Sequence, residues 1–179
     1  MSTFDKKAVR QHIRAAIAAL GNEHKSRASA DISAQVAATA ELREARTVAL
    51  FASLADEPQT TALIEQAQRD GKRVVVPRIE GDDMEFYDIA EGLCEGAYGI
   101  MEPTAAIPVD ASEIDVMVVP GVAFTRQGAR LGRGKGFYDR YLSRQGFRAF
   151  TIGICYRCQV VDTLPIEPHD KTCHTIISE

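Results

Sequence analysis

The sequence has little of what marks membrane, secreted or disordered proteins. Tryptophan is absent, which excludes nothing, and the four cysteines are too few for the disulfide framework of a small secreted protein. No run of about 18 apolar residues occurs, so a membrane-spanning helix is not expected. Charged and apolar positions are interleaved through residues 1–21, which is unlike a secretory signal. The sequence has no repeat, low-complexity tract or linker, and it predicts a cytoplasmic protein that does not contact membranes.

The composition is that of an ordinary globular domain. Of the 179 residues, 45% are apolar and 26% are charged, which is enough for one hydrophobic core. We expect a single domain over residues 1–179 and a monomer. The formal net charge is −4, which argues against a general polyanion-binding surface.

Patterns typical of helices and of strands alternate along the chain. Apolar residues at helical spacing predict helices over 4–20, from 22 to Ala40, over 60–69 and over 138–144, with Ser2 or Thr3 capping the first. Short β-branched runs predict strands over 47–51, 73–76, 84–89, 115–119, 149–154 and 175–177. Pro77 is expected to close the second of these. The alternation is typical of an α/β protein, and we predict a three-layer α/β/α fold with a mainly parallel sheet.

The segment 120–142, PGVAFTRQGARLGRGKGFYDRYL, stands out by its charge. It contains one acid, Asp139, and five basic residues, which are Arg126, Arg130, Arg133, Lys135 and Arg140. Four glycines allow backbone N–H groups to converge on an anion; these are Gly128, Gly132, Gly134 and Gly136. The segment follows the buried strand 115–119 and precedes a helix, which is where α/β sheets bind ligands. It predicts a cradle for a polyphosphate.

Known phosphate motifs do not describe this segment. In a P-loop, four residues separate the first glycine from Gly-Lys, but here five separate Gly128 from Gly134, and Gly136 follows the lysine. The dinucleotide fingerprint GxGxxG also fails, because Phe137 stands where its last glycine belongs. A flexible loop with solvated arginines remains an alternative. Asp139 favours the polyphosphate site, because an acid among cations is a natural ligand for the Mg²⁺ that accompanies ATP.

Two other kinds of function remain open at this point. Cys155 and Cys158 have CxxC spacing, and His169, Cys173 and His174 follow, so zinc binding or thiol redox chemistry is an alternative. Against it, Cys155 continues an apolar strand, where a small buried side chain is the ordinary reading. The Arg/Gly loop with Phe137 and Tyr138 could also bind RNA, but the acidic net charge argues against a nucleic-acid partner.

The segment 120–142 also resembles the signature of the 5-formyltetrahydrofolate cyclo-ligase family, close to PGlaFd-x-x-G-x-RLGxGxGyYDrfL. The resemblance extends to a basic first helix, to VALFASLADEPQT with Glu57, to GKRVVVPR, to YGIMEP and to D-x-x-x-H-x-I-I from Asp170. It covers essentially the whole chain. It implies an ATP- and Mg²⁺-dependent cyclisation of 5-formyltetrahydrofolate to 5,10-methenyltetrahydrofolate, in which the formyl oxygen is phosphorylated, N10 attacks, and ADP and phosphate are released.

The resemblance also implies residue roles. The ATP-binding residues would be Lys6, Lys7, Ala8, Val9, Arg10, Arg130, Leu131, Gly132, Arg133, Gly134, Lys135, Gly136, Phe137 and Tyr138. The substrate-binding residues would be Arg10, Ala52, Glu57, Arg133, Gly134, Lys135, Gly136 and Phe137. Lys135 and Arg133 would be catalytic, with Lys135 stabilising charge, and Asp139 and Asp170 would bind Mg²⁺. Three residues depart from the family pattern, where Tyr, Asp and Asp are usual: Phe137, Thr125 and His174.

Overall fold

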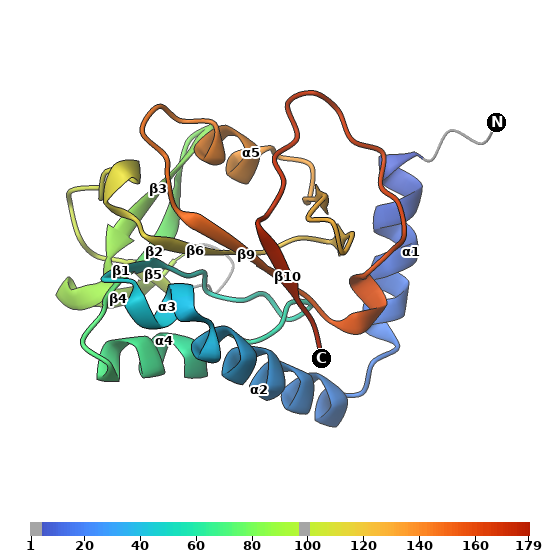
Figure 1. The fold of residues 1–179 in the computed structure, drawn as a ribbon, viewed down its shortest axis with the longest axis horizontal. Helices are drawn as coiled ribbons and strands as arrows, with labels where there is room; N and C mark the ends of the chain where they lie inside the picture. Colours follow the sequence, from blue (N-terminus) through green and yellow to red (C-terminus); the bar gives the residue numbers. More distant parts are fainter. Residues whose placement is uncertain (1–4, 97–100) are drawn as a thin grey trace.

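A six-stranded sheet forms the centre of the protein. The computed structural model describes residues 5–96 and 101–179, and the strand order is β10-β9-β6-β1-β2-β3 (Figure 1). The strands are β1 (Thr47–Ala49), β2 (Arg73–Glu80), β3 (Asp83–Asp88), β6 (Val116–Val119), β9 (Phe150–Ile154) and β10 (Thr175–Ile177). All neighbours are parallel except β2 and β3, which form an antiparallel hairpin. The predicted α/β class with a mainly parallel sheet is confirmed.

Helices cover both faces of this sheet. They are α1 (Lys6–Ala18), α2 (Asn22–Ala38), α3 (Ala40–Glu44), α4 (Thr61–Arg69) and α5 (Phe137–Leu142). Figure 1 shows α2, α3 and α4 together below the sheet, α5 on the opposite side and α1 upright beside the sheet. The three layers are as predicted. None of the helices in the described part of the chain is both long and apolar enough to span a membrane.

The period-two pattern of the strands divides the core between the two faces. In β6, Val116 and Val118 pack with the residues of α2, α3 and α4, whereas Met117 and Val119 pack with Tyr141 of α5. Both sets are almost fully buried. A strand that is apolar on both faces is typical of a parallel sheet covered on both sides.

The bounds of α1 and α2 differ from the sequence prediction. The second helix ends at Ala38, because Thr39 is extended and its hydroxyl accepts the N–H of Leu42 to begin α3. Asp5 caps α1 by accepting the N–H of Lys7. The expected caps, Ser2 and Thr3, lie outside the described residues, and so do the first three residues of YGIMEP, because 97–100 are not described.

Pro77 does not close β2. The N–H of Arg73 and the carbonyl of Val75 bond toward β1, so by alternation residue 77 faces the same side. Because β1 ends at Ala49, opposite Val75, no strand there needs an N–H from Pro77. β2 therefore continues to Glu80 and pairs with β3.

Short elements that the sequence did not predict surround the sheet. Two are antiparallel ladders, β4 (Leu93–Glu95) with β5 (Met101–Pro103) and β7 (Ala123–Phe124) with β8 (Arg130–Leu131). Three are 3₁₀ turns, η1 (Ile89–Glu91), η3 (Ala111–Glu113) and η4 (Arg157–Gln159). The β7–β8 ladder lies within the segment 120–142 and packs against α1.

Candidate active site

A cavity of about 430 Å³ opens where β1, β2 and β6 end. Phe51 and Pro120, which follow β1 and β6, and Pro77, which lies within β2, are part of its wall. All ten residues from Arg130 to Asp139 line it. The wall also contains the other predicted residues Lys6, Arg10, Ala52, Glu57 and Asp170. Segments far apart in the sequence thus meet at the edge where α/β sheets bind ligands.

Three of the predicted ATP-binding residues do not line this cavity. Lys7 and Ala8 point into solvent, and Val9 packs in the small core between α1 and the β7–β8 ladder. Lys6 and Arg10 are one helical turn apart and reach the cavity from the same face of α1. The structure therefore brings two residues of the predicted 6–10 segment to the site.

Arg10 closes one side of the glycine-rich loop. Its Nε donates to the carbonyl oxygen of Gly132 at 2.8 Å. The guanidinium also lies over Gly134, where an added Cβ would be 3.6 Å from it. At the other end of the loop, Gly136 has φ +72° and begins α5. The loop backbone is thereby held against the start of a helix.

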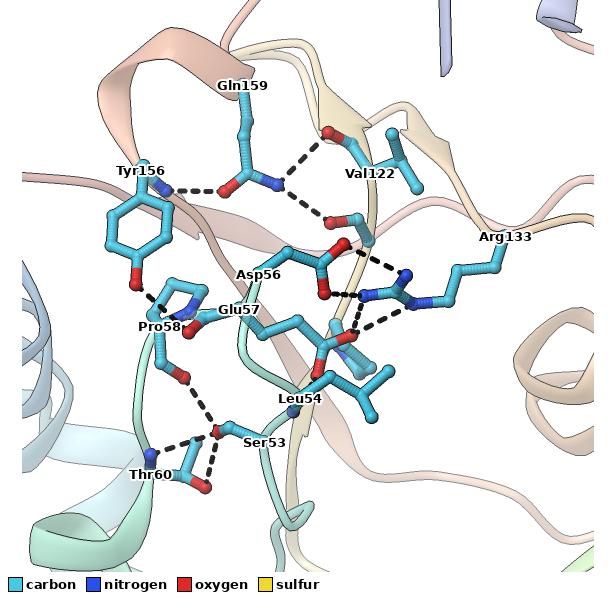
Figure 2. Close-up of polar contacts among 12 residues, drawn as sticks. Ser53, Leu54, Asp56, Glu57, Pro58, Thr60, Val122, Arg133, Tyr156 and Gln159 are labelled. Carbon is cyan, nitrogen blue, oxygen red and sulfur yellow. Dashed lines mark hydrogen bonds and ion pairs between the residues drawn. The ribbon is translucent and has the colours of Figure 1, made fainter. Parts of the chain in front are cut away.

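Arg133 is bound by two acidic side chains (Figure 2). Its Nη1 and Nη2 lie 3.1 and 2.6 Å from the carboxylate oxygens of Asp56, and its Nη2 and Nε lie 2.8 and 3.2 Å from Oε1 of Glu57. Burial would raise the pKa of Asp56, but the hydrogen bonds and charge of Arg133 outweigh it and lower that pKa. The resemblance implied that Arg133 binds ATP and substrate, and Asp56 was not singled out, although it precedes Glu57 in the loop after β1.

Glu57 is fixed from three directions. Only 7% of its side chain is exposed, and its Oε2 accepts the backbone N–H of Leu54 at 2.9 Å. Its carbonyl oxygen accepts the hydroxyl of the buried Tyr156 at 3.0 Å. The carboxylate is therefore held at the cavity wall in one orientation.

Arg130 and Asp139 form a second ion pair in the wall. Nη1 of Arg130 donates to Pro120 O, and its Nη2 lies 2.9 Å from Oδ1 of Asp139, but too far off the N–H direction for a hydrogen bond. The same Oδ1 accepts the N–H of Lys171 at 3.0 Å. Within the described residues, Nε and Nη2 of Arg130 and the hydroxyl of Tyr138 are buried without hydrogen-bond partners, and burial raises the pKa of Tyr138. Buried polar atoms that lie next to a cavity and have no hydrogen-bond partner are suited to bind a ligand.

Asp170 lies in a cluster with Glu167, which the sequence did not single out, and with His169, which the sequence indicated only as a possible zinc ligand. One ligand atom from each of the three lies within 4.8 Å of the others. Lys6 stands among them, with Nζ 2.6 Å from Glu167 and 2.8 Å from Asp170. Burial would raise the pKa of Asp170, but Lys6 and the N–H of Glu167 outweigh it and lower that pKa. The EPHD sequence at 167–170 was the available signal.

Lys135 differs from the other loop cations. It is exposed at the cavity, and no described residue accepts a hydrogen bond from its Nζ. Arg140 braces the loop from outside by donating to the carbonyl oxygens of Lys135 and Asp82 at 2.9 and 2.6 Å. Arg126 lies in the exposed β7–β8 turn, away from the cavity.

Two of the four cysteines pack in the core. Cys155 and Cys173 are buried in the core, and burial raises the pKa of their thiols to about 12 and about 11. The group of possible metal ligands found among the described residues includes no cysteine. Gln159, the last residue of the CxxCQ segment, accepts the N–H of Tyr156 and donates to Gly121 O and Val122 O. The zinc or redox alternative therefore has no support in the site geometry.

Known proteins that are similar to this chain share one family. The model of the 5-formyltetrahydrofolate cyclo-ligase family matches residues 2–179. The chain is 36% identical to 5-formyltetrahydrofolate cyclo-ligase of Escherichia coli (strain K12) over 75% of this chain and 78% of that protein. It is 30% identical to the Haemophilus influenzae enzyme of the same name over 99% of each chain.

Solved structures show the same relationship. The NMR structure of Aquifex aeolicus 5,10-methenyltetrahydrofolate synthetase superimposes with a TM-score of 0.85 at 31% identity, covering 96% of this chain and 88% of that one. A 5,10-methenyltetrahydrofolate synthetase from Mycoplasma pneumoniae superimposes with a TM-score of 0.81 at 28% identity, covering 98% and 99%. On sequence and fold alike, this chain belongs to the 5-formyltetrahydrofolate cyclo-ligase family of enzymes.

Proposed function

We propose that this enzyme converts 5-formyltetrahydrofolate and ATP into 5,10-methenyltetrahydrofolate, ADP and phosphate. The observation that carries the proposal is the single cavity in which Arg10, Glu57 and the whole loop from Arg130 to Asp139 meet. A glycine-rich cationic loop before a helix suits phosphates, and a buried carboxylate suits the N–H groups of a pterin. A cyclo-ligase using a nucleotide needs both on one surface.

The chemistry requires activation of an unreactive amide. The formyl oxygen attacks the γ-phosphorus of ATP, an O–P bond forms, and the bond from phosphorus to ADP breaks. N10 then attacks the formyl carbon and loses its proton, and the C–O bond breaks to release phosphate. Phosphoryl transfer of this kind depends on positioning and on neutralising oxygen charge rather than on covalent help from the protein.

Residue roles follow from the contacts in the free enzyme. Lys135 is a point charge without a partner among the described residues, so it is available to the phosphoryl oxygens. The loop backbone between Gly132 and Gly136 supplies N–H groups, and Arg10 fixes that backbone. Glu57 would accept pterin N–H groups, and Ala52 and Phe137 supply the apolar wall beside it.

The carboxylates in the wall fit Mg²⁺, which takes oxygen ligands from one or two acids together with nucleotide phosphates. Oδ2 of Asp139 accepts no hydrogen bond from the described residues, whereas Asp170 is paired with Lys6. We infer that Asp139 and Asp170 would hold the ion, with Asp139 the better placed. When bound, Mg²⁺ would neutralise charge on the phosphate oxygens.

The setting we infer is a monomeric cytoplasmic enzyme whose partners are its two small-molecule substrates. A cavity of this size is within the range typical of small-molecule sites. The whole of 1–179 would form the catalytic domain, because the cavity takes residues from both ends of the chain, Lys6 and Asp170 among them.

The test is a turnover assay with ATP, Mg²⁺ and 5-formyltetrahydrofolate, read by the ultraviolet absorbance of the methenyl product. Lys135→Ala should lower turnover on the order of 10²- to 10³-fold, because it removes a charge that acts on the transition state. Lys25→Ala, in α2 and away from the cavity, is the matched control and should keep wild-type turnover. Absence of product with the wild-type enzyme would refute the proposal.

A further inference from the structure

We propose that Asp56 is a positioning residue for folate recognition, acting through Arg133 on Glu57. The inference rests on the proposed function, in which Glu57 receives the pterin. Asp56 does not line the cavity, whereas Arg133 and Glu57 do. Its side chain is 37% exposed and contacts the far side of the guanidinium. Asp56 thus contacts the cavity wall through Arg133.

The two carboxylates use different edges of one guanidinium (Figure 2). Asp56 takes the end formed by Nη1 and Nη2, and Glu57 takes the side formed by Nη2 and Nε. This arrangement leaves one of the five N–H groups of Arg133 without an acid. In the free enzyme Arg133 therefore binds Asp56 and Glu57, and it is not available for bidentate hydrogen bonds to a phosphate.

The net charge of the group formed by Asp56, Arg133 and Glu57 explains how Asp56 affects Glu57. Two carboxylates and one guanidinium leave the group with one net negative charge, so Glu57 is oriented by Arg133 without being fully neutralised by it. Without Asp56, Arg133 and Glu57 would form a neutral pair, and the attraction of Glu57 for pterin N–H groups would weaken. The long arginine side chain would also lose the bidentate contact that holds its end in place.

The loop that carries both acids is rigid, so Asp56 is able to act as a fixed anchor. Ser53 Oγ donates to Pro58 O at 2.7 Å, Thr60 Oγ1 donates to Phe51 O, and Gln59 N donates to Ser29 Oγ at 2.9 Å. Tyr156 holds the carbonyl of Glu57 from the other side. An anchor on a mobile loop would have no such effect on Arg133.

The experiment is Asp56→Asn, which keeps the shape of the side chain and removes its charge. We expect the KM for 5-formyltetrahydrofolate to rise about tenfold while the KM for ATP changes less than about twofold. In an Arg133→Met background the same substitution should have no further effect on the folate KM, because Asp56 acts through Arg133. Asp56→Glu, which keeps the charge, should recover part of the loss.

The control is Asp88→Asn at a second arginine that is shared by two acids. Arg73 lies 2.8 Å from Asp88 and 3.0 Å from Glu113, and none of the three lines the cavity. This variant should keep both KM values. A rise in the ATP KM alone for Asp56→Asn would make Arg133 a phosphate ligand and overturn the inference, as would an unchanged folate KM. Wild-type turnover is measured first, so failure of the proposed function itself is seen separately.

Discussion

At the level of single residues, the cations of the segment 120–142 have unequal tasks. Arg130 pairs with Asp139, Arg133 with Asp56 and Glu57, and Arg140 supports the loop backbone. Lys135 alone among these four has no ion-pair partner in the described part of the chain. The excess positive charge seen in the sequence is therefore largely compensated within the fold, and one lysine is left to meet an incoming anion.

Asp115 shows how one acid stabilises the start of two strands. Its Oδ2 accepts the N–H groups of Arg46 and Thr47 at 2.9 Å each, and its Oδ1 lies 3.1 Å from Arg148. Burial would raise its pKa, but these hydrogen bonds and the arginine outweigh burial and lower the pKa. Asp115→Asn should lower the free energy of unfolding by about 1–2 kcal/mol at pH 7, measured by urea denaturation.

The pH dependence of this difference has a defined sign. Because the folded pKa of Asp115 lies below its ordinary value of 3.8, the carboxylate stabilises the fold above that pH, and the stabilisation is lost as the pH falls through the folded pKa. The difference between wild type and Asp115→Asn should shrink below about pH 4. Asp31→Asn, on the exposed face of α2, should show almost no difference at any pH. A pH-independent difference for Asp115→Asn would contradict this account.

At the level of elements, the β7–β8 turn depends on Gly128. Its φ is +96°, its carbonyl accepts the N–H of Cys173 at 2.8 Å, and a Cβ there would collide with the carbonyl oxygen of Cys173. Gly128→Ala should therefore lower the free energy of unfolding by more than about 2 kcal/mol, through backbone strain and displacement of the 173 segment.

Gly81 provides the matched control, because it lies in the β2–β3 turn with φ +63° and open space around a Cβ. Gly81→Ala should lower the free energy of unfolding by about 1 kcal/mol, through backbone strain alone. Chemical denaturation of the two variants measures both values. Equal losses would mean that the contact with Cys173 does not matter.

For the whole molecule, the cavity joins α1, the loop after β1, the segment 120–142 and the 167–170 segment, so a bound nucleotide should stabilise the entire fold. At ATP concentrations 100-fold above the dissociation constant, linkage adds about 2.7 kcal/mol, or roughly 5–10 °C in Tm for a domain of this size. Thermal unfolding with ATP and Mg²⁺ measures this shift, and chelation of Mg²⁺ should reduce it.

Lys135→Ala tests where that stabilisation originates. The variant should keep the Tm of the free enzyme, because Lys135 is exposed and outside the three hydrophobic clusters, yet show a smaller ATP-dependent shift. A full shift in the variant would mean that ATP binds without this lysine.

The sequence by itself determined the kinds of element and the place of the site. Hydrophobic periodicity is local information, and it was sufficient for the buried strands and for the layers, while the loop composition indicated an anion site after β6. Two predicted boundaries were wrong, at Thr39 because its hydroxyl caps a new helix, and at Pro77 because β1 ends before it and no strand needs its N–H.

Only the tertiary structure decided which charged groups pair and which remain available. Arg133 and Asp56 are 77 positions apart, and Lys6 and Asp170 are 164 apart. No pattern along the chain specifies such contacts, because ion pairing depends on distances of a few ångströms that arise when separate strand ends meet at one edge of the sheet. For the same reason Asp56, Glu167 and Tyr156 became visible as parts of the site only in the folded chain, and Lys135 as its unpaired cation.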